Sequence, residues 1–170
     1  DNKTLFYTSN NPETLLSEKI KRHVLGTDTD WDVTVYEEKD KSNYIGVVKS
    51  KNDKYIFIRS QATMSSEYRF IDASVPDAEF KIFQPRMKEV LYYITPLVDK
   101  FLIVTNWNAK NFRLMECPLN KTESSNWKEV IPVRADVLLS SVEEFKDFIV
   151  FSERKNGLIQ LKIQSLKDGQ

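Results

Sequence analysis

Residues 44–86 read YIGVVKSKNDKYIFIRSQATMSSEYRFIDASVPDAEFKIFQPR, four short apolar runs separated by polar turns. Val, Ile, Tyr and Phe fill the runs, which cover residues 44–48, 55–58, 68–71 and 80–83. Short runs of such residues, bounded by clusters of Asn, Asp, Ser and Pro, are typical of β-strands joined by tight turns. The stretch therefore predicts one up-and-down antiparallel sheet of four strands.

The same pattern recurs on both sides of this stretch. Further strands are expected at residues 4–8, 19–25, 33–36, 89–96, 101–106, 112–117, 127–133, 137–142, 148–153 and 158–164. The second strands of successive units begin near Thr4, Lys54, Lys100 and Asp147, in steps of 50, 46 and 47 residues. A repeat in the forties with four strands per unit is typical of β-propeller blades. A β-sandwich is the alternative, but sandwiches do not keep so regular a count of four.

The strand count predicts an all-β, partial β-propeller of about three and a half four-stranded antiparallel blades. We expect one domain over residues 1–170, with blades near 1–40, 41–86, 87–134 and 135–170. An open arc leaves two free sheet edges. The chain also begins at Asp1 rather than Met, so we expect a piece of a longer protein. In isolation, two copies are expected to pair through these open edges as a homodimer.

Composition excludes several function classes. The 25 basic and 25 acidic residues balance, so no bulk charge favours nucleic acid or an anionic membrane as a partner. The longest apolar runs are far too short to span a bilayer, so no membrane-spanning segment is expected. No signal peptide opens the sequence, but this excludes nothing because we expect a piece of a longer protein. The lone Cys117 excludes an internal disulfide and is compatible with a cytoplasmic location, which we expect without excluding the periplasm.

Several longer segments resemble a known family. They are QATMSSEYRFID at residues 61–72, TNWNAKNFRL at 105–114, DAEF at 77–80 and WKEVI at 127–131. In these segments the chain is similar to the propeller domain of the oligopeptidase B (protease II) group, in the prolyl oligopeptidase family of serine peptidases. The resemblance spans nearly the whole chain, and its segments fall in the same order.

The resemblance implies both a fold and a function. The family places a seven-bladed propeller over an α/β-hydrolase domain that carries a Ser, Asp and His triad. The propeller acts as a lid and size filter that admits short peptides, and oligopeptidase B cleaves after Arg or Lys. The expected partners are therefore the catalytic domain of the same parent chain and short peptide substrates. The alternative is a non-enzymatic propeller scaffold for protein–protein interaction.

No catalytic, cofactor-binding or metal site is expected in the chain itself. A nucleophile elbow needs Gly-x-Ser-x-Gly, and no two of the four glycines are close enough to form one. The only histidine, His23, falls in an expected strand and is interpreted as structural rather than as a general base. Cys117, also in a strand, is interpreted as a small apolar residue rather than a nucleophile.

The remaining charged and aromatic candidates have ordinary structural interpretations. Asp28, Asp30 and Asp32 resemble the start of a calcium loop but lack the Gly and the distant Glu that such a loop needs. In the expected strands, Glu67 lies close to Arg69 and Glu116 close to Arg113, and a further strand carries Arg59. These arginines either line a channel or face the catalytic domain, or they pair with acids within and between blades, which we favour. Trp107 either forms an interface or covers a blade end.

Overall fold

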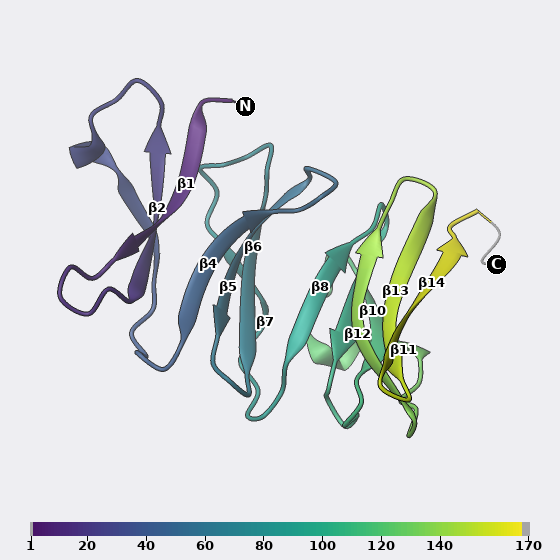
Figure 1. The fold of residues 1–170 in the computed structure, drawn as a ribbon. Coiled ribbons are helices and arrows are strands. Elements are labelled where there is room, and N and C mark those ends of the chain that lie inside the picture. The colour runs from purple at the N-terminus through teal and green to yellow at the C-terminus, as the bar shows by residue number, and fades with distance from the viewer. Residues whose placement is uncertain (1, 168–170) are drawn as a thin grey trace. The chain divides into compact units, whose positions relative to one another are not determined.

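The computed structural model describes residues 2–167, which form four antiparallel sheets and two short 3-10 helices (Figure 1). The chain divides into two compact units, Asp1–Lys88 and Glu89–Gln170, and each unit holds two of the sheets. In the described part, no helix is long and apolar enough to cross a membrane.

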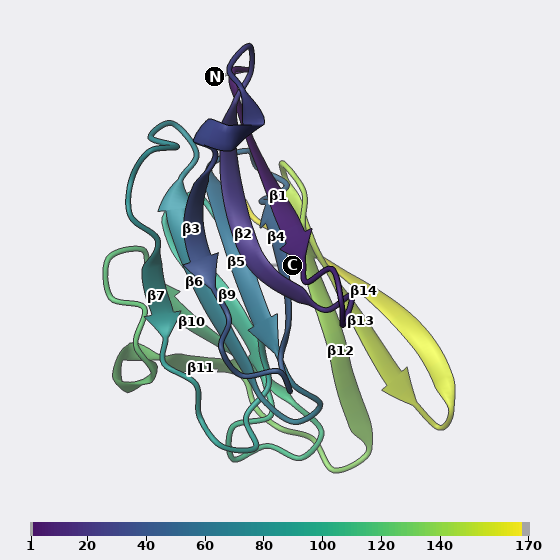
Figure 2. The same cartoon turned by 90° about the vertical axis from the view of Figure 1, so that its left-hand side faces the viewer.

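The first unit begins with a three-stranded sheet in the order β1-β2-β3. Its strands are β1 (Thr4–Asn10), β2 (Ser17–Val24) and β3 (Val33–Glu37). Figure 2 shows them side by side in this order, with the turn of 3-10 helix η1 (Thr29–Trp31) leading into β3. In β2, Ile20 is fully buried while its neighbours Lys19 and Lys21 are only partly buried, so the face that carries Ile20 packs against a core.

The second sheet of this unit confirms the interpretation of residues 44–86. Its strands are β4 (Tyr44–Lys49), β5 (Tyr55–Gln61), β6 (Ser66–Asp72) and β7 (Lys81–Gln84), in that order and antiparallel throughout. Each predicted apolar run lies within or overlaps one strand. The turns need little glycine, because Asp53 adopts the left-handed conformation between β4 and β5 with φ of 61°.

An isoleucine-rich core joins the two sheets of the first unit. Ile20 from β2 and Ile58 from β5 are almost fully buried in it, together with Ile45, Ile56, Ile71 and Phe80. Burying one such side chain stabilises the fold by about 1.5–3 kcal/mol. The other face of the second sheet is aromatic, where rings contact one another edge-on or tilted across Tyr55, Phe57, Tyr68, Phe70 and Phe83.

The second unit repeats this organisation. Its four-stranded sheet has the order β11-β10-β9-β8, with β8 (Tyr92–Pro96), β9 (Lys100–Thr105), β10 (Arg113–Pro118) and β11 (Lys128–Ile131). Its three-stranded sheet contains β12 (Val137–Glu144), β13 (Phe148–Lys155) and β14 (Leu158–Ser165). A leucine-rich core joins the two sheets, and the Thr95 hydroxyl donates to the Val142 carbonyl at 3.0 Å.

Some strand ends differ from the predictions for a backbone reason. Residues 89 and 112 were expected in strands, but Glu89 and Phe112 both have φ of 59°, which no extended strand accommodates. The strands therefore begin at Tyr92 and Arg113. The strand expected at residues 127–133 is shorter, because β11 ends at Ile131 directly before Pro132, at the edge of its sheet.

Candidate functional site

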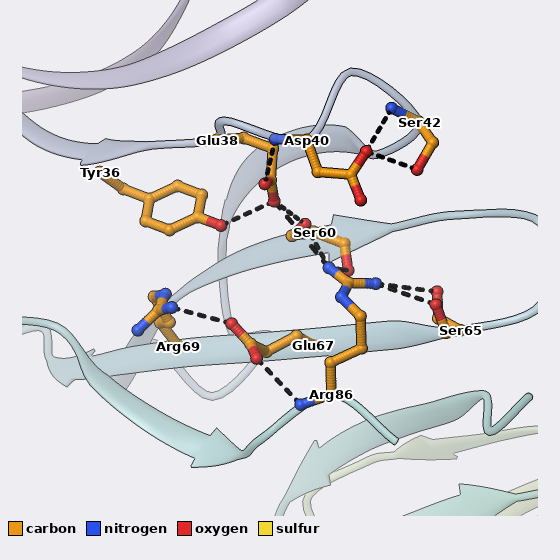
Figure 3. Close-up of polar contacts among 9 residues, drawn as sticks. All are labelled: Tyr36, Glu38, Asp40, Ser42, Ser60, Ser65, Glu67, Arg69 and Arg86. Atoms are coloured by element: carbon orange, nitrogen blue, oxygen red, sulfur yellow. Dashed lines mark hydrogen bonds and ion pairs between the residues drawn. The ribbon is translucent and has the colours of Figure 1, made fainter. Parts of the chain in front are cut away.

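The densest polar cluster of the first unit joins its two sheets (Figure 3). We call it the Glu38 junction, formed by Tyr36, Glu38, Ser60, Ser65, Glu67, Arg69 and Arg86. These residues come from the end of β3, the end of β5, the start of β6 and the segment that follows β7. Consecutive antiparallel strands bring all four of these chain segments to the same end of the sheets.

The Glu38 carboxylate is the acceptor at the centre of the junction. It accepts hydrogen bonds from the Ser60 hydroxyl, from the Tyr36 hydroxyl at 2.8 Å and from the Asp40 amide at 3.0 Å. Burial alone would raise the pKa of Glu38, but the bonds from Ser60, Asp40 and Tyr36 outweigh it and lower the pKa. Glu38 is therefore held as a carboxylate, which makes it a poor general acid.

Arg86 is the cation of the same junction. Its guanidinium donates to the Ser60 hydroxyl at 2.6 Å and to the Ser65 hydroxyl at 3.1 Å, and it lies 3.9 Å from Glu38. Its backbone amide donates to Glu67 at 2.9 Å. Arg86 thus fastens the segment leaving β7 to both β5 and β6.

Arg69 completes the junction, and its predicted pairing with Glu67 is confirmed. The two side chains, two residues apart on one face of β6, form an ion pair at 2.8 Å. The guanidinium also lies over the Tyr36 ring, 4.8 Å from its centroid, which adds a cation–π contact across the two sheets.

The second unit has a smaller polar cluster at the corresponding place, which we call the Glu153 junction. Glu153 in β13 is only 2 % exposed and accepts from both Arg134 guanidinium nitrogens and from Lys162, whose Nζ lies 2.8 Å away. Burial alone would raise the pKa of Glu153, but the bonds from Arg134 and Lys162 lower it. Arg134 lies in the linker between β11 and β12. Asn111 also holds this linker, by donating to the Arg134 and Ala135 carbonyls at 2.9 Å.

Both junctions are suited to holding sheets together and not to bond chemistry. Each carboxylate is ionised and surrounded by donors, and each hydroxyl in the cluster is already a donor or acceptor. The Glu38 junction is the candidate functional site because it fixes the relative position of two blades.

The family model for the N-terminal β-propeller domain of prolyl oligopeptidase matches residues 1–170. The chain belongs to this family. Membership confirms the resemblance found in the sequence and the all-β, partial propeller fold. It also sets aside the alternative of a scaffold unrelated to any peptidase.

The curated relatives that the chain matches are named as peptidases. It is 41 % identical over 164 residues to dipeptidyl aminopeptidase BI of Pseudoxanthomonas mexicana, a match that covers 96 % of this chain and 22 % of that protein. It is 32 % identical over 152 residues to protease 2 of Moraxella lacunata, covering 89 % of this chain and 21 % of the relative. The chain therefore spans about a fifth of the curated relatives it matches.

Solved structures agree with this assignment. Oligopeptidase B from Leishmania major superimposes with a TM-score of 0.90 at 28 % identity, over 99 % of this chain and 24 % of that one. Oligopeptidase B from Trypanosoma brucei, with covalently bound antipain, gives a TM-score of 0.89 at 25 % identity, over 100 % of this chain and 24 % of that one. The four sheets are thus a segment of a prolyl oligopeptidase propeller.

Within this propeller segment, His23 and Asp32 lie together, a pairing that the sequence analysis did not predict. The His23 Nδ1 lies 2.6 Å from one Asp32 oxygen, and the Tyr7 hydroxyl donates to the other at 2.6 Å. The bond from Tyr7, and then that from His23, lowers the pKa of Asp32. Asp28 instead accepts from the Asp30 amide and caps the 3-10 helix. Across residues 2–167, no group of three or more His, Cys, Asp or Glu is placed to hold a metal ion.

Cys117 is buried in β10, and burial raises its pKa to about 12. A thiol with so high a pKa is not a nucleophile at neutral pH. Its position in a core strand agrees with its interpretation as a small apolar residue.

Arg113 pairs with an acidic residue of its own blade, as favoured from the sequence, but its partner is Glu129 and not the nearby Glu116. Residues three apart in a strand point to opposite faces, so Glu116 pairs with Lys100 at 2.7 Å instead. Arg113 pairs with Glu129 on the neighbouring strand at 3.1 Å and lies 5.5 Å from the centroid of Trp107. Trp107 also contacts Trp127 edge-on at 5.8 Å, so it covers the end of its blade.

Arg59 differs from the other two arginines. It is exposed, and none of the hydrogen bonds or ion pairs in the described residues involves its side chain. The expectation that all three arginines pair with acids is therefore wrong for Arg59.

Sequence reasoning missed both junctions, although a signal was present. A polar residue recurs near the end of each second strand, and the three examples are Ser60, Asn106 and Glu153, 46 and 47 residues apart. Each one binds the linker that enters its sheet. Asn106 accepts from the Leu91 amide at 2.8 Å and donates to the Glu89 carbonyl at 3.2 Å.

Proposed function

We propose that this propeller segment acts as part of a lid and size filter over a catalytic domain carried by the same parent chain. The observation that carries the proposal is the match of all 170 residues to the propeller family, with oligopeptidase B as a structural neighbour. Gating is a steric function, because a narrow channel admits a short extended peptide and excludes a folded protein. The role needs no reactive side chain in the propeller, only blades that stay together.

The parent protein is proposed to be a serine-type oligopeptidase that cleaves short peptides after basic residues. Likeness to oligopeptidase B and to protease 2 supports this substrate class. The 170-residue chain alone is proposed to be inactive, because it lacks a Gly-x-Ser-x-Gly elbow and its only histidine is engaged by Asp32. The cytoplasmic location stays a prediction that rests on the single Cys117.

A second candidate activity comes from the 41 % identical relative, which is named a dipeptidyl aminopeptidase. Such an enzyme removes dipeptides from a free amino terminus, so it would need an unblocked substrate. A basic-residue oligopeptidase would cleave a blocked substrate equally well.

One assay of the full parent reading frame tests these proposals. Short substrates carrying Arg, Lys or Pro before the scissile bond are compared with free and with acetylated amino termini, and a folded protein rich in Lys serves as the size control. We expect rapid cleavage after Arg and Lys in short peptides, loss of activity with a serine-directed organophosphate, and no cleavage of the folded protein. Cleavage confined to free amino termini would favour the dipeptidyl activity, and failure to cleave any short peptide would overturn both.

The isolated chain is further proposed to pair with a second copy through its open edges. In β14, the edge strand of its sheet, Ile159, Leu161 and Ile163 alternate on one face and are 64 %, 69 % and 67 % exposed. An edge strand with such a face is a template for strand addition. Sedimentation of the chain at micromolar concentration is expected to show a dimer, and a purely monomeric species would contradict the proposal.

A further inference from the structure

One region of the first unit combines an exposed cation with open space beside a strand edge. We call it the Gly46–Arg59 site, formed by Tyr44, Gly46 and Val48 on β4 and Arg59 on β5. The three β4 residues alternate along the strand, so they share one face of the sheet. Arg59 lies directly opposite Gly46 in the β4–β5 register, so its side chain projects from this same face.

The charge of Arg59 is uncompensated within the described residues. Its side chain is exposed and takes part in no ion pair or hydrogen bond there. Arg69 and Arg113, the other strand arginines singled out in the sequence, each have an acidic partner within 3.1 Å and an aromatic ring beneath the guanidinium. Arg59 therefore retains its full set of donors for a ligand.

Gly46 leaves room for a ligand beside this cation. A Cβ built at Gly46 would meet no atom within 4 Å, so the space in front of the residue is open. The β8–β9 pair in the second unit shows the contrasting arrangement, where the corresponding positions hold Tyr92 and Thr105 and the tyrosine is fully buried. Tyr92 thus fills this position of the repeat in the second unit, whereas Gly46 leaves it open in the first.

The third feature is an unpaired strand edge. Within the described sheets, β4 pairs with β5 alone. The Ser50 amide donates to the Tyr55 carbonyl at the end of this ladder. Because successive amides in an antiparallel strand alternate in direction, those of Ile45, Val47 and Lys49 point away from β5. These groups can accept an additional strand.

We propose that the Gly46–Arg59 site binds an extended peptide segment that carries a carboxylate side chain. The peptide backbone adds to the free edge of β4, and the carboxylate forms a forked pair with the Arg59 guanidinium across Gly46. Tyr44 and Val48, which are 68 % and 56 % exposed, contact the apolar neighbours of the acidic residue. This binding function is additional to gating, because it needs only the propeller segment and involves no hydrolysis of the bound peptide.

Chemistry favours this occupant over a small free anion. A guanidinium binds carboxylates in a planar, bidentate fashion. A strand edge and two apolar side chains add contacts that only a peptide can use. In a bound extended peptide, every second side chain projects on the same face of the sheet as Arg59. An acidic residue at one of these positions can therefore reach the guanidinium.

The test uses two blocked probe peptides, acetyl-Thr-Val-Glu-Val-Thr-amide and its Gln counterpart, titrated calorimetrically into the full parent protein. Neither probe has a basic residue, so neither is a substrate of the proposed peptidase. We expect the Glu peptide to bind about tenfold more tightly than the Gln peptide, as a charge-assisted hydrogen bond predicts. The Arg59→Gln variant is expected to abolish this difference, and Arg59→Lys to keep part of it.

Two further variants serve as controls. Gly46→Val fills the open space with a residue that suits a strand and is expected to weaken both probes. Arg154→Gln removes another exposed strand arginine, in β13, and is expected to change nothing. Equal affinity of the two probes for the wild-type protein, or an Arg154→Gln effect equal to that of Arg59→Gln, would overturn the proposal. Hydrolysis of an Arg-containing substrate, measured in parallel, reports separately on the proposed peptidase function.

Discussion

The Glu38 and Glu153 junctions occupy the same place in their repeats but distribute charge in opposite ways. Ser60 is the sixth residue of β5, and Glu153 is the sixth residue of β13. In the first unit the linker supplies the carboxylate, Glu38, and the strand supplies a hydroxyl. In the second unit the linker supplies the cation, Arg134, and the strand supplies the carboxylate. A repeat can therefore keep a contact while exchanging the residues that make it.

The two junctions also differ in how many acceptors each basic side chain has. Arg86 donates to Ser60 and Ser65 as well as approaching Glu38, so no single acceptor holds it. In the described residues, the Arg134 and Lys162 side chains donate only to Glu153. The first junction is thus a distributed network, and the second depends on one buried carboxylate.

The largest effect is expected from Glu153→Gln. The substitution leaves two cations beside a neutral, buried amide, and removing one partner of a buried ion pair costs about 3–5 kcal/mol. Urea unfolding at neutral pH measures the loss in free energy of unfolding. Asp136→Asn is the matched control, because Asp136 pairs with Lys155 in the same region at a solvent-exposed site. Equal stability of the two variants would contradict the inference that the second junction depends on the Glu153 carboxylate.

Glu38→Gln is expected to cost less, about 2 kcal/mol, since hydrogen bonds to charged groups are worth about 1.5–3 kcal/mol each and Arg86 keeps its serine acceptors. The adjacent Glu37→Gln is the control. Glu37 is half-exposed and only 3.9 Å from Lys19, so its loss should change the unfolding free energy by less than about 0.5 kcal/mol. If Glu38→Gln destabilised the chain more than Glu153→Gln, the comparison between the junctions would be reversed.

Acid should weaken both junctions. The folded protein lowers the pKa of Glu38 and of Glu153 below the ordinary 4.5, so the unfolded chain takes up protons first as pH falls. The stabilisation is therefore present above about pH 4.5 and is lost as pH drops through the lowered values. Unfolding free energies at several pH values should show the difference between wild type and Glu153→Gln shrinking below about pH 4.5. A difference that stays constant would mean that Glu153 titrates normally.

The fold was predictable because its determinants are local. Alternation within residues 44–86 and the repeat spacing specify strands and their order, and Lys155 and Leu158 pair around Asn156-Gly157 as that dipeptide predicts. The junctions were not predictable from the same pattern. Glu38 and Ser60 are 22 residues apart, and their contact depends on how two sheets pack. The error at Glu116 came from judging proximity by sequence distance instead of by strand face.

The smallest effects are expected at the two equivalent arginines of the third strands. Arg69→Lys keeps the charge but loses the planar contact with Tyr36 and the hydrogen bond from the guanidinium to Glu67, which predicts a loss of about 0.5–1 kcal/mol. Arg113→Lys should cost less, because its partner Glu129 is more exposed than Glu67. Arg59→Lys is the matched control and should leave stability unchanged, since Arg59 has no partner among the described residues. Thermal unfolding of the three variants under identical conditions gives the order of their stabilities directly. A loss of stability in Arg59→Lys equal to that in Arg69→Lys would show that the ring contact across the sheets contributes nothing.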